Sequence, residues 1–100
     1  MAEKIFLDPT GSERFRGNIN ALAQDILEGI ENETYVWDDE NEGYVVDFKD
    51  LKYDFPDDEA DLAVVSEALA DVIPEQLTEM GYNVSIDGTV TFNGDYLVVS

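Results

Sequence analysis

The chain has 100 residues, of which 24 are acidic and five are basic, and its formal net charge is −19 at pH 7. It contains no cysteine and no histidine, which excludes disulfides, thiolate chemistry, and the commonest zinc ligand and general base. Hydrophobic residues make up 44% of the chain, so we expect one folded domain over residues 1–100 and not a disordered polyanion.

The first predicted elements are an edge strand and a helix. Residues 4–7 form a short apolar run that Asp8 and Pro9 end. Ser12 has the side chain of an N-cap, and from Phe15 to Ile30 apolar residues recur at spacings of three and four. This pattern predicts an amphipathic helix over residues 13–31.

A β-hairpin with an acidic tip is expected next. Residues 34–37 and 44–48 are rich in β-forming side chains, and residues 38–43 between them supply turn formers. The alternation of apolar residues changes parity between Phe48 and Leu51, which predicts a bulge or bend.

A second helix is predicted between an acidic start at 57–59 and Gly81, which suits the left-handed position after a helix. Pro74 lies inside this segment, so we expect a kink or a break near residues 71–73. The residues expected to face the core are Leu62, Val65, Leu69, Val72, Gln76, Leu77 and Met80.

Three short strands are predicted at the end of the chain, over residues 82–85, 89–92 and 96–99. An Ile86–Gly88 turn would pair Val84 with Val90, and an Asn93–Gly94 turn would pair Val90 with Leu97. The predicted fold class is α+β. Two amphipathic helices pack on one face of a mostly antiparallel sheet, in the order (β)-α-β-β-α-β-β-β, ending in a three-stranded meander.

Catalysis has little support in the sequence. Without histidine or cysteine a nucleophilic site would need Ser with Lys, but Ser12, Ser66 and Ser85 lie in no recognisable elbow or S-x-x-K motif. Among 24 carboxylates some pair always has the spacing for acid–base chemistry, so such a pair carries no information. We expect a non-enzymatic protein without a cofactor.

Metal binding is weakly suggested by the run from Asp38 to Gly43, which partly matches the start of a calcium loop, D-x-[DN]-x-[DN]-G. The twelfth position of that loop is Lys49 and not the bidentate glutamate that the loop requires. Strands, and not helices, are predicted on either side. We therefore predict no functional metal site, although such a tip can bind Ca²⁺ or Mg²⁺ adventitiously.

The carboxylates themselves are the strongest functional signal. The predicted second helix carries acids four residues apart, opposite its apolar stripe, with no lysine between them to relieve their repulsion. Fixed rows of carboxylates resemble the charge lattice of a nucleic-acid backbone, which a basic groove would bind with release of counterions. The residues predicted to bind a partner are Asp38, Asp39, Glu40 and Glu42 at the hairpin tip, Glu67, Asp71 and Glu75 on the helix, and Tyr35 as an aromatic anchor.

Three functions remain open. In size and composition the chain resembles the acidic, phage-encoded anti-restriction and anti-CRISPR inhibitors, which implies a nucleic-acid mimic that blocks a basic nucleic-acid-binding protein, such as a restriction enzyme or CRISPR effector. The alternatives are a small acidic adaptor and an ordinary domain of a halophile.

A polyanion is repelled by nucleic acid and by anionic lipid, and no apolar run suits a signal peptide or membrane span. We therefore expect a cytoplasmic protein with a protein partner.

Overall fold

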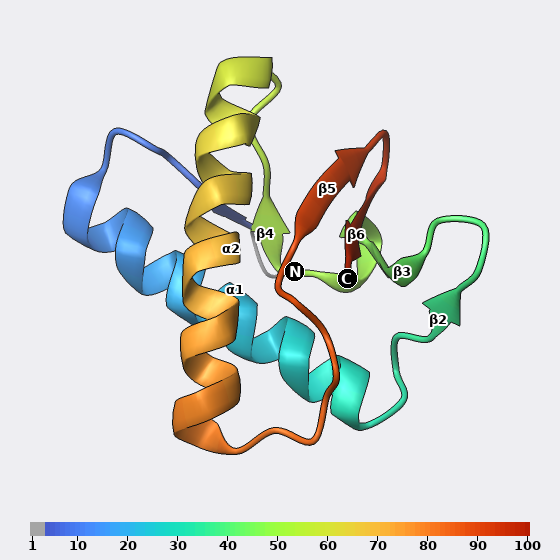
Figure 1. Cartoon of the computed structure of the whole chain (residues 1–100). Helices are drawn as coiled ribbons and strands as arrows, with labels where there is room; N and C mark the ends of the chain where they lie inside the picture. Colours follow the sequence, from blue (N-terminus) through green and yellow to red (C-terminus); the bar gives the residue numbers. More distant parts are fainter. Residues whose placement is uncertain (1–3) are drawn as a thin grey trace.

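The computed structural model describes residues 4–100, and of Ser12 it describes the backbone alone. Two helices, α1 (Ser12–Glu31) and α2 (Glu59–Met80), cross each other and pack beside an antiparallel sheet (Figure 1). The strands of this sheet are β2 (Trp37–Asp38), β3 (Gly43–Asp47), β5 (Val90–Asn93) and β6 (Tyr96–Val99), in the spatial order β2-β3-β6-β5. The predicted α+β class is therefore confirmed.

A second, two-stranded sheet lies beside the helices. In it β1 (Ile5–Phe6) pairs in parallel with β4 (Tyr53–Asp54). The bend expected between Phe48 and Leu51 is present as a short 3₁₀ helix, η1 (Phe48–Asp50). It begins where the Asp47 side chain accepts a hydrogen bond from the Lys49 N–H at 2.9 Å. This turn ends β3 and allows the chain to start β4 in the other sheet.

The interior of the domain is apolar. Among the described residues none that is polar or charged is buried. Most fully buried side chains come from both helices and the central strands, and with Leu7 they belong to one cluster: Ile19, Leu22, Ile26, Leu27, Val65, Leu69, Ile73, Val46, Leu97 and Val99. Burial of a large aliphatic side chain is worth about 1.5–3 kcal/mol, so this cluster is the main source of stability.

Local hydrogen bonds mark where the helices begin and end. The helix predicted over 13–31 is confirmed, but Ser12 is its first residue and not its N-cap, which is Gly11. The preceding turn is held by Asp8, whose carboxylate accepts from both the N–H and the hydroxyl of Thr10. The expected end of the helix is confirmed, since Asn32 is the C-cap of α1.

The second helix differs from the prediction at its centre. It begins after Asp58, whose side chain accepts from the Asp61 N–H, and ends at Gly81 in the left-handed conformation (φ 67°). It runs through Pro74 without the break that this residue suggested. Of its three buried residues, Val65 and Leu69 belong to the predicted stripe, and Ile73 does not. Met80, also predicted to face the core, is 55% exposed because the helix extends past the core there.

The end of the chain also differs in detail. Residues 82–85 do not form a strand, and β3 is the third member of the antiparallel set with β5 and β6. The N–H groups of Asp87, Gly88 and Thr89 instead donate to the Ser100 carbonyl, which curves this segment around the chain end. Val90 pairs with Val99, and not with Leu97 as predicted, so the register is shifted by two residues and the apolar side chains keep their common face.

Two glycines of α1 provide a matched test of the packing. A Cβ at Gly29 would collide with the ring of Tyr35, whereas a Cβ at Gly17 would meet nothing within 4 Å. We expect Gly29→Ala to destabilise the domain by about 1–3 kcal/mol through overpacking. Gly17→Ala should stabilise it by up to about 1 kcal/mol because alanine favours helix. Urea unfolding followed by circular dichroism measures both values, and equal effects of the two substitutions would contradict this packing.

Candidate partner-binding surface

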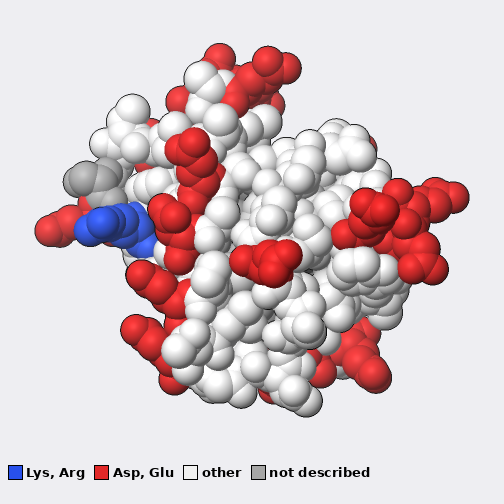
Figure 2. Space-filling view, viewed as in Figure 1, with Lys and Arg blue, Asp and Glu red and all other residues white. Residues whose placement is uncertain are grey.

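The charge of the molecule is unevenly placed. The segment from Tyr53 to Ser100 contains eleven acidic residues and no Lys or Arg. On the face shown in Figure 2, acidic side chains gather along the flank of α2 and over the β2–β3 hairpin, at opposite sides of mostly uncharged surface. Within residues 4–100 one ion pair is found, Lys52 Nζ to Asp25 Oδ2 at 3.9 Å. It lies at the surface and contributes at most about 1 kcal/mol, so most carboxylates lack a cationic neighbour.

The acidic tip, Asp38–Glu42, divides into two kinds of carboxylate. The Asp38 side chain accepts from the Glu40 N–H at 3.2 Å and from Asn41 Nδ2 at 2.6 Å. Asp39 accepts from the indole Nε1 of Trp37 at 3.1 Å. Asp38 and Asp39 therefore help to build the turn. Glu40 and Glu42 are exposed and make no such bond, so their charge faces solvent.

Two glutamates are held in a backbone conformation that favours glycine. Glu33, just after α1, has φ 65°, and Glu42, at the end of the tip, has φ 55°. A side chain in this left-handed region costs roughly 1–2 kcal/mol. Unfavourable backbone conformations of this kind gather at functional sites, and here both carry a carboxylate that is exposed.

The α2 ridge, consisting of Glu67, Asp71 and Glu75, is a separate surface. All three side chains are exposed on one helix, with successive acids four positions apart. Asp71 and Glu75 also line a groove of about 620 Å³ between the helices, and Arg16 of α1 lines the same groove. The ridge thus has a cation of the chain itself nearby, which reduces its negative potential.

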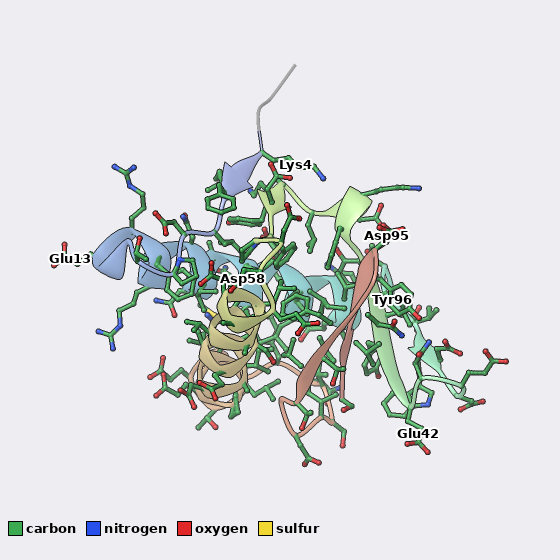
Figure 3. The ribbon with its side chains drawn as sticks, turned by 90° about the horizontal axis from the view of Figure 1, so that it is seen from above. Lys4, Glu13, Glu42, Asp58, Asp95 and Tyr96 are labelled. Atoms are coloured by element: carbon green, nitrogen blue, oxygen red, sulfur yellow. The ribbon has the colours of Figure 1, made fainter. Side chains whose placement is uncertain are left out.

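The ridge and the tip do not meet. Figure 3, seen from above, shows Glu42 projecting at the hairpin, well to one side of the start of α2, where Asp58 lies. Figure 2 shows the same separation across one face. The structure therefore brings the predicted acidic residues together as two sets, and a single partner would have to span the surface between them to touch both.

The aromatic residue available to a partner is Trp37 and not Tyr35. Tyr35 is only 8% exposed, packs on Gly29, and can offer a partner little of its ring. Trp37 is 48% exposed, and its ring meets that of Tyr44 edge-on at 5.4 Å. Its exposure could have been predicted from its position at the start of a short edge strand, directly before the acidic tip.

No metal centre is evident. Among residues 4–100, no group of three acidic side chains converges so that it could hold an ion. At the tip, both carboxylate oxygens of Asp38 already accept hydrogen bonds from the turn. None of the described helices has an apolar stretch long enough to cross a bilayer.

Comparison with known proteins adds no assignment. No protein-family model, curated protein or solved structure matches this chain. The function is therefore inferred from the surface of the molecule.

Alkaline pH should destabilise the domain through its tyrosines. Burial raises the pKa of Tyr35, Tyr53 and Tyr82, and nearby carboxylates, among them Asp25, raise it further. A raised pKa means that the folded state holds the phenol proton more tightly, so this contribution to stability is present below pH 10 and is lost above it. We expect the free energy of unfolding to fall as the pH rises above about 10, and Tyr82→Phe to reduce the fall. Urea unfolding across this range measures it, and no fall, or the same fall in the variant, would contradict the assignment.

Relief of the strained backbone at Glu42 should stabilise the protein. Glycine removes the left-handed strain but adds flexibility to the unfolded chain, which leaves a net gain of roughly 0.5–1 kcal/mol for Glu42→Gly. Glu42→Gln removes the same charge and keeps the strain, so its stability should stay within about 0.5 kcal/mol of the parent. Thermal or urea unfolding of the two variants separates backbone strain from charge. A gain in Glu42→Gln equal to that in Glu42→Gly would assign the effect to charge.

Proposed function

We propose that the protein is a non-enzymatic inhibitor that imitates nucleic acid and occupies the nucleic-acid-binding surface of a basic protein. The observation that carries this proposal is the set of exposed carboxylates on α2 and the hairpin that form no ion pair within residues 4–100, in a molecule of net charge −19. An acidic surface meant only for solubility would more often intersperse both signs of charge.

The positions of the acids support a role beyond solubility. The last turns of α1 and α2 contain no basic residue, although cations are favoured at the negative end of a helix dipole. Glu28 and Glu79 lie in or beside those turns, where a carboxylate is unfavourable, whereas the Glu31 carboxylate has a structural role and accepts from the Asn83 N–H at 3.1 Å. Local stability would favour lysine at such positions, so the carboxylates are best explained by what they bind.

The spacing of the acids on the α2 ridge can be compared with the spacing of phosphates in DNA. Acids four residues apart on a helix are separated by about 6 Å along its axis. One strand of duplex DNA presents a charge every 3.4 Å of axis, so the ridge alone has roughly half the charge density of a strand. The tip is a second cluster, and a long basic groove could contact both. Such a partner would be attracted from a distance and then blocked sterically.

Capture from host lysate tests the class of partner. The immobilised chain, loaded at low salt and eluted with a salt ramp, should retain a basic nucleic-acid-binding protein, and added duplex or guide nucleic acid should displace it. The acidic chain itself, measured alone, should unfold at nearly the same temperature in low and high salt. A melt that requires high salt would favour the halophile alternative. Retention that nucleic acid does not displace would favour an adaptor.

Paired charge reversals locate the surface. Glu67→Lys with Glu75→Lys alters the ridge, and Glu40→Lys with Glu42→Lys alters the tip, with the same change in net charge. We expect each pair to weaken the captured complex at least about ten-fold, because placing like charges across an interface costs several kcal/mol. The salt dependence of the affinity should also become less steep.

A matched control reverses the same number of charges elsewhere. Asp50 lies in η1 and Asp95, labelled in Figure 3, lies in the β5–β6 turn, and both are exposed. Asp50→Lys with Asp95→Lys should weaken binding much less than the ridge or tip pairs. Equal losses in all three variants would mean that net charge alone governs binding, and the mimic would have no defined surface.

An adaptor remains the second candidate because two adjacent apolar residues are exposed beside the acidic tip. Val36 is 65% exposed and Trp37 48% exposed, next to the acidic tip. Tryptophan is enriched among the residues that dominate protein interfaces. An adaptor would use this patch to hold a basic protein at a site other than its nucleic-acid groove.

A further inference from the structure

We propose that an arginine side chain of the basic partner binds in the Trp37 hollow, a depression of about 760 Å³ lined by Ile30, Glu31, Glu33, Trp37, Tyr44 and Val84. This inference rests on the proposed function, since it names the residue by which the same partner is anchored. The hollow lies past the end of α1, between the hairpin and the segment that follows α2.

The hollow offers an aromatic surface in a fixed position. Trp37 is half-exposed, and its indole is held from two sides, by the Nε1–H donated to Asp39 and by the edge-on contact with Tyr44. A cation over a tryptophan face gains about 0.5–1 kcal/mol at an exposed site and about 2 kcal/mol when desolvated. Because the ring is already ordered, little conformational entropy would be lost on binding.

The rim of the hollow has the charge that a cation requires. Glu31 and Glu33 are exposed at its edge, and the carbonyl end of α1 adds the negative end of a helix dipole. Burial raises the pKa of the nearby Tyr82 phenol, and Glu28 and Glu31 raise it further, which is consistent with negative potential at this end of the helix. Glu33 keeps its carboxylate there in spite of its left-handed backbone.

No cation of the chain competes for this position. Three other hollows in the described part of the molecule are each lined by a basic residue of the chain, namely Lys4, Arg16 or Arg14. The lining of the Trp37 hollow contains no Lys or Arg. Arginine fits better than lysine because its planar guanidinium can stack on an indole and donate to a carboxylate at the same time.

The single tryptophan of the chain makes the test direct. The full chain would be titrated at low salt with a short tri-arginine peptide and with its tri-lysine counterpart, while the indole N–H resonance and the fluorescence of Trp37 are followed. We expect a saturable change at Trp37, with tighter binding of the arginine peptide. Trp37→Leu should weaken binding of the arginine peptide roughly three- to thirty-fold. Because this variant has no indole, its binding is measured from backbone amide resonances.

A matched pair of charge deletions separates the hollow from the total charge. Glu33→Gln and Glu75→Gln each remove one negative charge, the first at the rim of the hollow and the second on the α2 ridge. Glu33→Gln should weaken the arginine peptide more than Glu75→Gln does. Neither substitution alters a buried side chain, so both variants should fold.

Three results would overturn the inference: an unchanged Trp37 signal, equal affinity for the two peptides, or equal effects of the two deletions. The lysate capture tests the proposed function, and its outcome does not depend on the outcome of the peptide titration. Lysate capture that nucleic acid displaces and that Trp37→Leu leaves unchanged would keep the proposed function and refute the hollow. Arginine binding at Trp37 without capture of a nucleic-acid-binding protein would keep the hollow and refute the mimic.

Discussion

The packing of α1 and α2 against the antiparallel sheet is the interaction on which the molecule depends. Leu22 and Ile26 of α1 meet Leu69 and Ile73 of α2 in a core with no polar residue buried among the described positions. Each large aliphatic side chain contributes about 1.5–3 kcal/mol, whereas an adjacent pair of like charges on a helix costs only about 0.2–0.5 kcal/mol. The core therefore tolerates many repulsive pairs, and a domain of this size can fold with a net charge of −19.

Because the core stabilises the domain by more than these repulsions cost, the fold tolerates glutamates at locally unfavourable surface positions, and such glutamates point to a function. The core offsets their cost, but it does not require glutamate at Glu28, Glu33 or Glu42. Glycine or lysine would be more stable at these positions. Sequences generally agree with their fold at every level and depart from it where function intervenes. The three departures flank Trp37 in the chain, and for this reason we place the partner's anchor there and not on the ridge.

The sequence predicted both helices and the fold class because apolar periodicity and helix-end residues are local signals. It failed where tertiary contacts decide between local alternatives. Tyr35 and Trp37 belong to one short extended run, and either could have faced the core. The choice is made by Gly29, whose missing side chain admits the Tyr35 ring and whose carbonyl accepts the Tyr35 N–H. Likewise, residues 82–85 have strand-forming side chains but do not pair with β5, because the turn that follows them is held by the Ser100 carbonyl, which accepts from the N–H groups of residues 87–89.

The acidic tip shows how binding and folding are coupled in this protein. Asp39 is both a carboxylate of the predicted partner surface and the acceptor that orients the Trp37 indole, and Asp38 holds the turn through two hydrogen bonds. A substitution at either aspartate would remove charge and loosen the aromatic anchor together, so its effect could not be assigned to one cause. Glu33 and Glu40 make no such bonds and are exposed. The charge of this surface can therefore be separated from its architecture at the glutamates but not at the aspartates.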